Sequence, residues 1–221
     1  MLRYKICVLF LSIISIFAFS FFKVSADSLP LSNRLIYLDA GHGGTDPGAL
    51  YKNIYEKDIN LEIVYKLKET LEKQGATVLL TRYGDYDLAV PNAINRKRSD
   101  LSRRANIIDE SLCDLYISIH LNAESSSTWN GAQVFYDDVN KDNEKLAKII
   151  QEELKKNTST TRKYKKTDEM YMYKRIERLG VLVEVGFISN PNERHLLRQN
   201  WYQEKLSNII TNGILKYFSQ K

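Results

Sequence analysis

Residues 34–44 read RLIYLDAGHGG, a short apolar run that breaks into a glycine-rich turn. The apolar run over 34–40 is typical of a buried strand, and the glycines end it. From Glu56 onward, apolar residues recur at four-residue spacing until Gly75, which predicts an amphipathic helix. Residues 76–81 then predict a second strand. Strand, helix and strand in this order are typical of an α/β sheet with helical crossovers.

The rest of the chain continues this pattern. Residues 83–100 contain glycine, proline and scattered charges, which predict a surface loop. The further predicted strands and helices lie at 102–110, 115–119, 133–136, 143–155, 181–185 and 203–218. The 221 residues contain no internal repeat and no linker long enough to join a second domain. The sequence therefore predicts a single α/β domain, with a mostly parallel or mixed sheet and helices on both faces.

Residues 1–26 differ from the rest of the chain. Arg3 and Lys5 precede residues 6–22, a mainly apolar stretch without a charge, and Lys23 and then three small residues ending at Ala26 follow it. This order is typical of a signal peptide cleaved after Ala26, which predicts an exported, extracytoplasmic domain over residues 27–221. The apolar stretch is slightly shorter than the roughly 20 residues of a comfortable membrane span. Retention of the segment as an N-terminal membrane anchor therefore stays open.

The positive charge of the chain belongs partly to this leader. The formal net charge is +5, but without residues 1–26 the chain has 29 basic against 27 acidic side chains, a net charge of +2. No basic stripe accompanies a nucleic-acid-binding motif, so we expect no nucleic-acid partner. Basic residues do cluster within 96–104 and within 155–174. We interpret both clusters as solvated faces, and attraction of an anionic polymer or membrane surface is the alternative.

Two histidines and two glutamates occupy positions where chemistry is expected. His42 and His120 directly follow apolar strands, Glu184 lies within the apolar run 181–185, and Glu56 opens the helix after the His42 turn. In open α/β sheets, residues beyond the carboxyl ends of the strands converge in space. A catalytic zinc takes about three ligands from histidine and carboxylate and leaves one position for water. His42, Glu56 and His120 would satisfy that requirement.

Each of these residues also has a plainer interpretation. A lone histidine at a strand end is more often a hydrogen-bonded core residue, and a glutamate in the first turn of a helix is favourable with the helix dipole. The third histidine, His195, lies in a polar stretch and is not a ligand candidate. The four residues together, set in DAGHGG and SIHLNA, favour the metal site. This pattern alone predicts a metal hydrolase and does not name its substrate.

Four motifs in order resemble the zinc-dependent N-acetylmuramoyl-L-alanine amidases. They are LDAGHGG at 38–44, Glu56 with the helix that leads to LLTR at 79–82, ISIHLNA at 117–123 and LVEVGFISN at 182–190. The resemblance extends from about residue 34 to residue 218. It implies a peptidoglycan substrate, in which the bond cut joins the lactyl group of N-acetylmuramic acid to L-alanine of the stem peptide.

The resemblance also implies the roles of the site residues. His42, Glu56 and His120 would bind zinc, and Glu184 would be the catalytic glutamate. Zinc lowers the pKa of a bound water toward ~7, and a glutamate beside it acts first as general base and then as general acid. Asp39 and Asn122 are candidates to orient a metal ligand from behind, although either can equally hold its own turn.

The chain departs from the usual pattern of the family at two places, neither of them a proposed ligand. The chain has Leu179 and Gly180 where members of the family commonly have a proline, and Asp109 where asparagine is usual. A compact core behind an export signal, without wall-binding repeats, is similar to the CwlD-type amidases of spore formers. These enzymes remove peptides from cortex muramic acid so that muramic-δ-lactam can form. The resemblance thus implies a role in spore cortex maturation and germination, and a vegetative wall role stays open.

Two rival functions remain at this point. A different zinc hydrolase, such as a peptidoglycan peptidase or a sugar N-deacetylase, could use the same ligands. A catalytically inactive wall-binding protein could keep the fold, but it would not need His42, Glu56, His120 and Glu184 together. Because no wall-binding module is recognised, we also expect an extracytoplasmic partner protein that supports activity.

Overall fold

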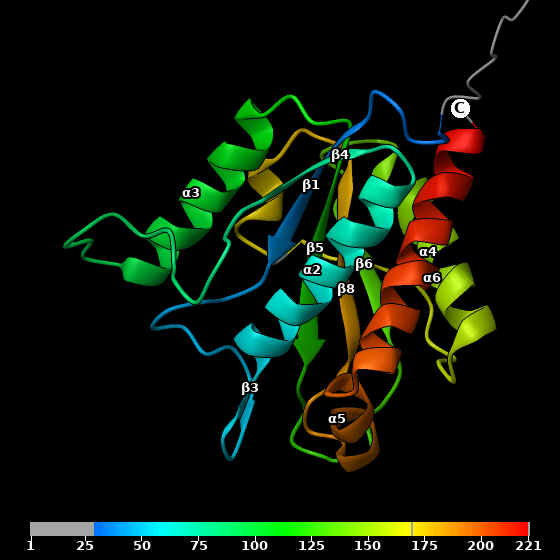
Figure 1. Cartoon of the computed structure of the whole chain (residues 1–221). Helices are drawn as coiled ribbons and strands as arrows, with labels where there is room; N and C mark the ends of the chain where they lie inside the picture. Colours follow the sequence, from blue (N-terminus) through cyan, green and yellow to red (C-terminus); the bar gives the residue numbers. More distant parts are fainter. Residues whose placement is uncertain (1–28, 169, 221) are drawn as a thin grey trace, which may run out of the picture.

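A mixed six-stranded sheet forms the centre of the protein, in the order β4-β1-β5-β8-β6-β7 (Figure 1). The structure is a computed structural model that describes residues 29–168 and 170–220. The strands are β1 (Leu35–Ala40), β4 (Thr77–Leu80), β5 (Leu115–Asn122), β6 (Gln133–Tyr136), β7 (Lys165–Lys166) and β8 (Gly180–Phe187). The β4, β1, β5 and β8 strands run parallel, whereas β6 pairs with β8 in antiparallel fashion. The predicted mostly parallel or mixed sheet is confirmed.

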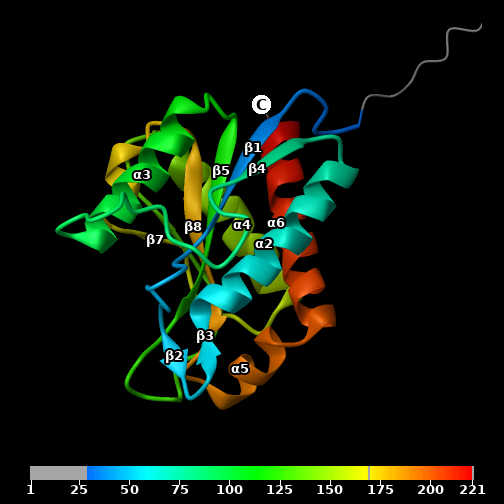
Figure 2. The same cartoon turned by 60° about the vertical axis from the view of Figure 1, so that its left-hand side comes forward.

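Helices cover both faces of this sheet. The larger layer contains α2 (Glu56–Lys73), α4 (Asn143–Asn157) and α6 (Asn200–Ser219), which pack against one another and share one hydrophobic core with the sheet. Figure 2 shows α3 (Arg96–Glu110) on the opposite side of the sheet. The short helix η1 (Tyr173–Arg175) packs against α3 and contributes to a second, smaller core. The prediction of helices on both faces is therefore also confirmed.

Alternation along the strands decides which side chains face α3. In β5, the side chains of Ile117 and Ile119 belong to the large core, whereas Tyr116 belongs to the small one. In β8, Val183 belongs to the large core and Leu182 to the small one. Because side chains alternate between the two faces of a strand, the polar residues interleaved with the large-core positions project toward α3 and η1.

The predicted helix after the glycine-rich turn is present as α2. Its buried face carries the apolar residues of the four-residue repeat, Ile59, Ile63, Leu67 and Leu71. The helix ends at Lys73, and Gly75 follows it with a φ of +93°. A Cβ atom on Gly75 would lie 2.7 Å from Cβ of Leu29, so this turn requires glycine.

One prediction of local structure needs correction, and several short elements were not predicted. The segment 83–100 is not a loop throughout, because α3 begins at Arg96, where the Asn95 side chain accepts a hydrogen bond from the backbone amide of Arg98. This cap extends the helix that the sequence predicts from residue 102. The hairpin of β2 (Leu50–Tyr51) and β3 (Ile54–Tyr55) and the helix α5 (Pro191–Leu197) were not predicted.

The predicted leader, residues 1–26, lies outside the described residues. Within the described part of the chain, no helix is both long and apolar enough to cross a membrane.

Candidate metal centre and catalytic site

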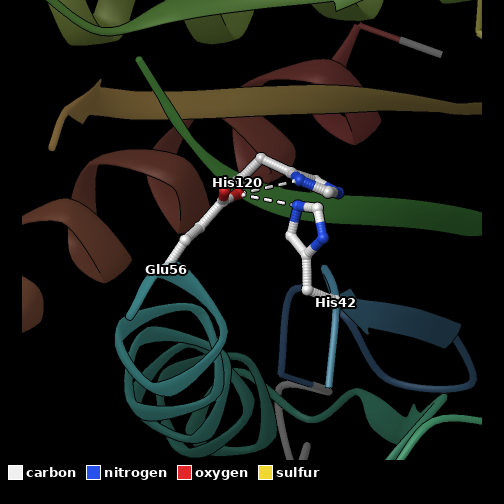
Figure 3. Close-up of side chains that lie close together, drawn as sticks. All are labelled: His42, Glu56 and His120. Carbon is white, nitrogen blue, oxygen red and sulfur yellow. Dashed lines mark hydrogen bonds and ion pairs between the residues drawn. The ribbon is translucent and has the colours of Figure 1, made fainter. Parts of the chain in front are cut away.

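Three of the predicted site residues meet at the carboxyl ends of β1 and β5. His42 lies in the turn after β1, His120 lies near the end of β5, and Glu56 is the first residue of α2. Figure 3 shows both imidazole rings directed at the Glu56 carboxylate. One ligand atom from each residue lies within 4.8 Å of the other two. The structure thus brings together the three residues that the sequence proposed as metal ligands.

The glycine-rich turn makes this approach possible. His42 itself adopts a left-handed conformation, with a φ of 63°. A Cβ atom on Gly41 would overlap the His120 ring, and one on Gly48 would lie 2.6 Å from Oε2 of Glu56. Glycine at these two positions therefore lets the backbone pass close to all three ligand side chains.

Glu56 contacts both histidines of the cluster. Its Oε1 lies 3.2 Å from Nε2 of His42 and 3.1 Å from Nδ1 of His120, and it accepts a 2.9 Å hydrogen bond from the amide of Leu121. Its Oε2 accepts a hydrogen bond of 2.8 Å from the amide of Ala49. Burial raises the pKa of Glu56, but hydrogen bonds from His120 and His42 outweigh it and hold this pKa well below its usual value. Glu56 is therefore a carboxylate held in place before any ligand binds.

His42 has a second partner that the sequence analysis missed. Its Nδ1 lies 2.9 Å from Oδ2 of Asp46, whose pKa is lowered to about 2, chiefly by the hydrogen bond with His42. An ionised carboxylate only accepts hydrogen bonds, so Nδ1 of His42 donates to Asp46, and Nε2, which faces Glu56, is the nitrogen that can give up its proton to bind a metal. The signal was present in the sequence, because Asp46 stands four residues after His42 in the same turn.

Glu184 lies next to His120, on the neighbouring strand of the sheet. The two residues are register partners on the parallel strands β5 and β8. Glu184, His42 and His120 line one cavity of about 320 Å³. Within the described residues, Oε2 of Glu184 is buried without a hydrogen-bond partner. Burial, and next the charge of Glu56, raise the pKa of Glu184 to about 8. A carboxyl group with a pKa near neutrality can both accept and return a proton.

Two buried arginines hold the backbone of the turn. Arg104 pairs with Asp39 at 2.7 Å and with Asp100 at 2.9 Å, and it donates to the carbonyl of His42 at 2.6 Å. Arg82 donates to the carbonyl of Ala40 at 2.9 Å. The interpretation of the basic cluster 96–104 as a solvated face is therefore wrong for Arg104, which is 1% exposed. Its other members, Arg96, Lys97, Arg98 and Arg103, are exposed.

Asp39 and Asn122, which the sequence suggested as residues that orient a metal ligand, make no direct hydrogen bond with a ligand side chain among the described residues. Asp39 contacts neither histidine by a hydrogen bond and instead accepts from Thr81, Arg104 and Ser118. The backbone carbonyl of Asn122 accepts from the amide of Ile188, and among the described residues no hydrogen bond joins its side chain to a ligand. His195 is exposed on α5, away from the candidate ligands, as the sequence predicts.

Comparison with known proteins defines the class to which this fold and site belong. The sequence profile of the N-acetylmuramoyl-L-alanine amidases of the Amidase_3 type matches residues 36–216. This match covers most of the chain, and the protein belongs to this family. It is an N-acetylmuramoyl-L-alanine amidase, as its four motifs predict.

Individual members of the family are similar to this chain over most of its length. The chain is 47% identical over 198 residues to the germination-specific N-acetylmuramoyl-L-alanine amidase of Bacillus subtilis, covering 88% of this chain and 84% of that protein. Its structure is similar to that of the CwlD amidase from Clostridioides difficile, solved in complex with the GerS lipoprotein. That likeness has a TM-score of 0.82 at 43% identity and covers 86% of this chain and all of the other. An N-acetylmuramoyl-L-alanine amidase from Clostridium difficile 630 gives a TM-score of 0.76 at 29% identity, covering 85% of this chain and 98% of that one. The predicted similarity to CwlD-type amidases is confirmed.

Proposed function

We propose that this amidase is zinc-dependent, with His42, Glu56 and His120 as the ligands and Glu184 as the group that moves the proton. One observation supports the ligand set above all others. Nε2 of His42, Oε1 of Glu56 and Nδ1 of His120 converge on one point, and the pair of histidines with one carboxylate is a donor set typical of catalytic zinc. The residues present therefore fit the metal that the family implies.

The chemistry of hydrolysis divides between the metal and the chain. A zinc ion, when bound, supplies Lewis-acid polarisation of the scissile carbonyl and of the attacking water. Glu184 faces the same cavity with a carboxylate oxygen that has no partner among the described residues. In our proposal this oxygen takes the proton of the water and then delivers it to the amine of L-alanine, which leaves with a new amino terminus.

The substrate bond distinguishes this proposal from other zinc hydrolases. Digestion of purified peptidoglycan by residues 27–221 should release stem peptides that begin with L-alanine, and the glycan should keep its acetyl groups. The reaction should stop in the presence of a chelator and resume after zinc is added. Mass analysis of the fragments is the measurement. Cleavage within the stem peptide, or loss of acetyl groups, would favour the peptidase or deacetylase alternative.

We further propose that the physiological substrate is the spore cortex. The support comes from the printed function of the Bacillus subtilis relative, which is germination-specific. Spores that lack this protein should contain cortex muramic acid with its peptides attached and little muramic-δ-lactam. A normal lactam content in such spores would instead favour a role of this protein in the vegetative wall.

The similarity to a structure solved with a lipoprotein supports the expected extracytoplasmic partner. We propose that residues 27–221 form the catalytic domain outside the cytoplasm, and that residues 1–26 serve as export signal or membrane anchor. Isolated residues 27–221 should therefore cleave cortex peptidoglycan slowly, and a lipoprotein from the same organism should accelerate the reaction. Rapid cleavage by the isolated domain would argue against a partner. Sequencing the amino terminus of the exported protein decides between signal and anchor, because cleavage exposes Asp27.

A further inference from the structure

A buried chain of hydrogen bonds begins at Nε2 of His120, the ring nitrogen that does not face Glu56. Nε2 of His120 lies 3.4 Å from the hydroxyl oxygen of Tyr173, and this hydroxyl donates to Oγ of Ser118 at 3.0 Å. Ser118 in turn donates to Oδ2 of Asp39 at 2.6 Å. These hydrogen bonds connect η1 to β5 and β5 to β1, on the α3 face of the sheet. Tyr173, Ser118 and Asp39 are all buried.

The ionised carboxylate of Asp39, at the buried end of this chain, decides which group donates in each of the hydrogen bonds. Burial raises the pKa of Asp39, but the charge of Arg104 and the hydrogen bond from Ser118 outweigh it and lower this pKa to about 2. The ionised carboxylate can only accept, so Ser118 must use its proton there. The Ser118 oxygen is then free to accept from Tyr173. Once the Tyr173 proton is used, its oxygen can only accept from His120.

We propose that Tyr173, backed by Ser118 and Asp39, is a positioning residue that keeps the proton of His120 on Nε2 and leaves Nδ1 to bind the metal. The inference rests on the proposed function in taking His120 as a ligand. Hydrogen bonds to the far nitrogen of a ligand histidine fix its tautomer and ring orientation. Asp39 thus supports a ligand as the sequence analysis suggested, but it acts through two intervening hydroxyl groups.

The two ligand histidines are held in opposite tautomers. Asp46 accepts from Nδ1 of His42, which leaves Nε2 for the metal, whereas Tyr173 accepts from Nε2 of His120, which leaves Nδ1. In both rings the nitrogen left for the metal faces Oε1 of Glu56, to which it donates a hydrogen bond while no metal is bound. Two differently placed partners are needed because the rings approach the site from different elements, the β1 turn and β5.

Neighbouring residues offer a matched control for the Tyr173 hydroxyl. The ring of Tyr173 stacks on that of Tyr116, with 6.4 Å between centroids and 4° between planes. Both side chains are buried on the same face of the sheet. Within the described residues, however, the Tyr116 hydroxyl has no hydrogen-bond partner. Substitution of either tyrosine by phenylalanine keeps the ring packing, but only the Tyr173 change breaks the chain to His120.

Zinc affinity is the primary test. We would measure the dissociation constant of zinc by competition with a chelator at neutral pH for the wild type, Tyr173→Phe, Ser118→Ala and Tyr116→Phe. Loss of a partner behind a ligand histidine typically weakens metal binding by about 10- to 100-fold, which we expect for Tyr173→Phe. Ser118→Ala should also weaken binding, because the freed Tyr173 proton can then point at Nε2. Tyr116→Phe should bind zinc like the wild type.

The tautomer of His120 provides a readout independent of affinity. Nitrogen-15 NMR of the zinc-bound wild type should place the His120 proton on Nε2, and the melting temperature should show that each variant is folded. Wild-type zinc affinity in both folded Tyr173→Phe and folded Ser118→Ala, or a proton on Nδ1 in the wild type, would overturn the inference. A wild type that binds no zinc would instead overturn the proposed function itself.

Discussion

Replacing Glu184 by glutamine should separate catalysis from stability, because the structure predicts opposite effects on the two. The substitution keeps the shape of the side chain and removes its ability to carry a proton. General acid–base catalysis typically contributes a factor of about 10² to 10⁴, so we expect a loss of turnover of that size. Zinc content should not change, because Glu184 is not one of the three clustered ligand residues.

The stability effect follows from the raised pKa of the buried carboxyl. Burial moves the pKa of Glu184 from its ordinary value of 4.5 to about 8. Its contribution to stability is therefore intact below pH 4.5 and is lost as the pH rises toward 8, because ionisation is harder in the folded state. At pH 7 the loss is about 3 kcal/mol, since one pKa unit corresponds to ~1.4 kcal/mol. In metal-free protein Glu184→Gln should recover part of this free energy at pH 7 and little of it at pH 4.

The assay compares Glu184→Gln with Glu193→Gln in the same buffers. The carboxylate of Glu193 accepts hydrogen bonds from the amides of Gly131 and Phe187, at 2.9 Å and 2.8 Å. An amide nitrogen there would face a donor, so Glu193→Gln should lose about 1–3 kcal/mol and keep its turnover per folded molecule. Zinc stoichiometry, unfolding free energy and amidase rate would be measured on each preparation. Near-normal turnover in Glu184→Gln would refute the catalytic assignment.

Three further predictions concern the metal and the buried ion pairs. His42→Ala or His120→Ala should lose bound zinc on dialysis together with activity, whereas His195→Ala, on exposed α5, should retain one zinc per chain; metal analysis decides this. A zinc concentration 1,000 times the dissociation constant should raise the unfolding free energy by about 4 kcal/mol, and calorimetry showing no shift would contradict binding to the folded state. Arg104→Met leaves two buried carboxylates unpaired and should cost about 3–5 kcal/mol by denaturant unfolding, compared with at most about 0.5 kcal/mol for its exposed neighbour Arg103→Met.

The sequence predicted the residues of the candidate metal site because their positions follow simple rules. His42 and His120 directly follow or end buried strands, and Glu56 opens a helix with a clear apolar repeat. Parallel strands bring their carboxyl ends to one edge, so residues far apart in the chain could be placed together without knowledge of the full fold. Glu184 stands out in the sequence because a carboxylate within the apolar run 181–185 costs free energy unless a metal or a hydrogen-bonding partner compensates.

The supporting residues could not be predicted in this way. Tyr173 lies in the irregular segment between β7 and β8, where no periodicity indicates which side chain points inward. Arg104 belongs to a run of basic residues on a helix, and its burial depends on partners on other elements, Asp39 and the carbonyl of His42, as well as on Asp100. Contacts of this kind depend on the packing of α3 and η1 against the sheet, which local sequence patterns do not specify.

One zinc ion is proposed to bind where His42, Glu56 and His120 converge. A crystal structure of the zinc-loaded protein, with anomalous diffraction recorded at the zinc absorption edge, tests it most directly. We predict a single anomalous peak about 2.0–2.2 Å from Nε2 of His42, an oxygen of Glu56 and Nδ1 of His120. A peak bound by other residues, or by the opposite ring nitrogens, would contradict the account.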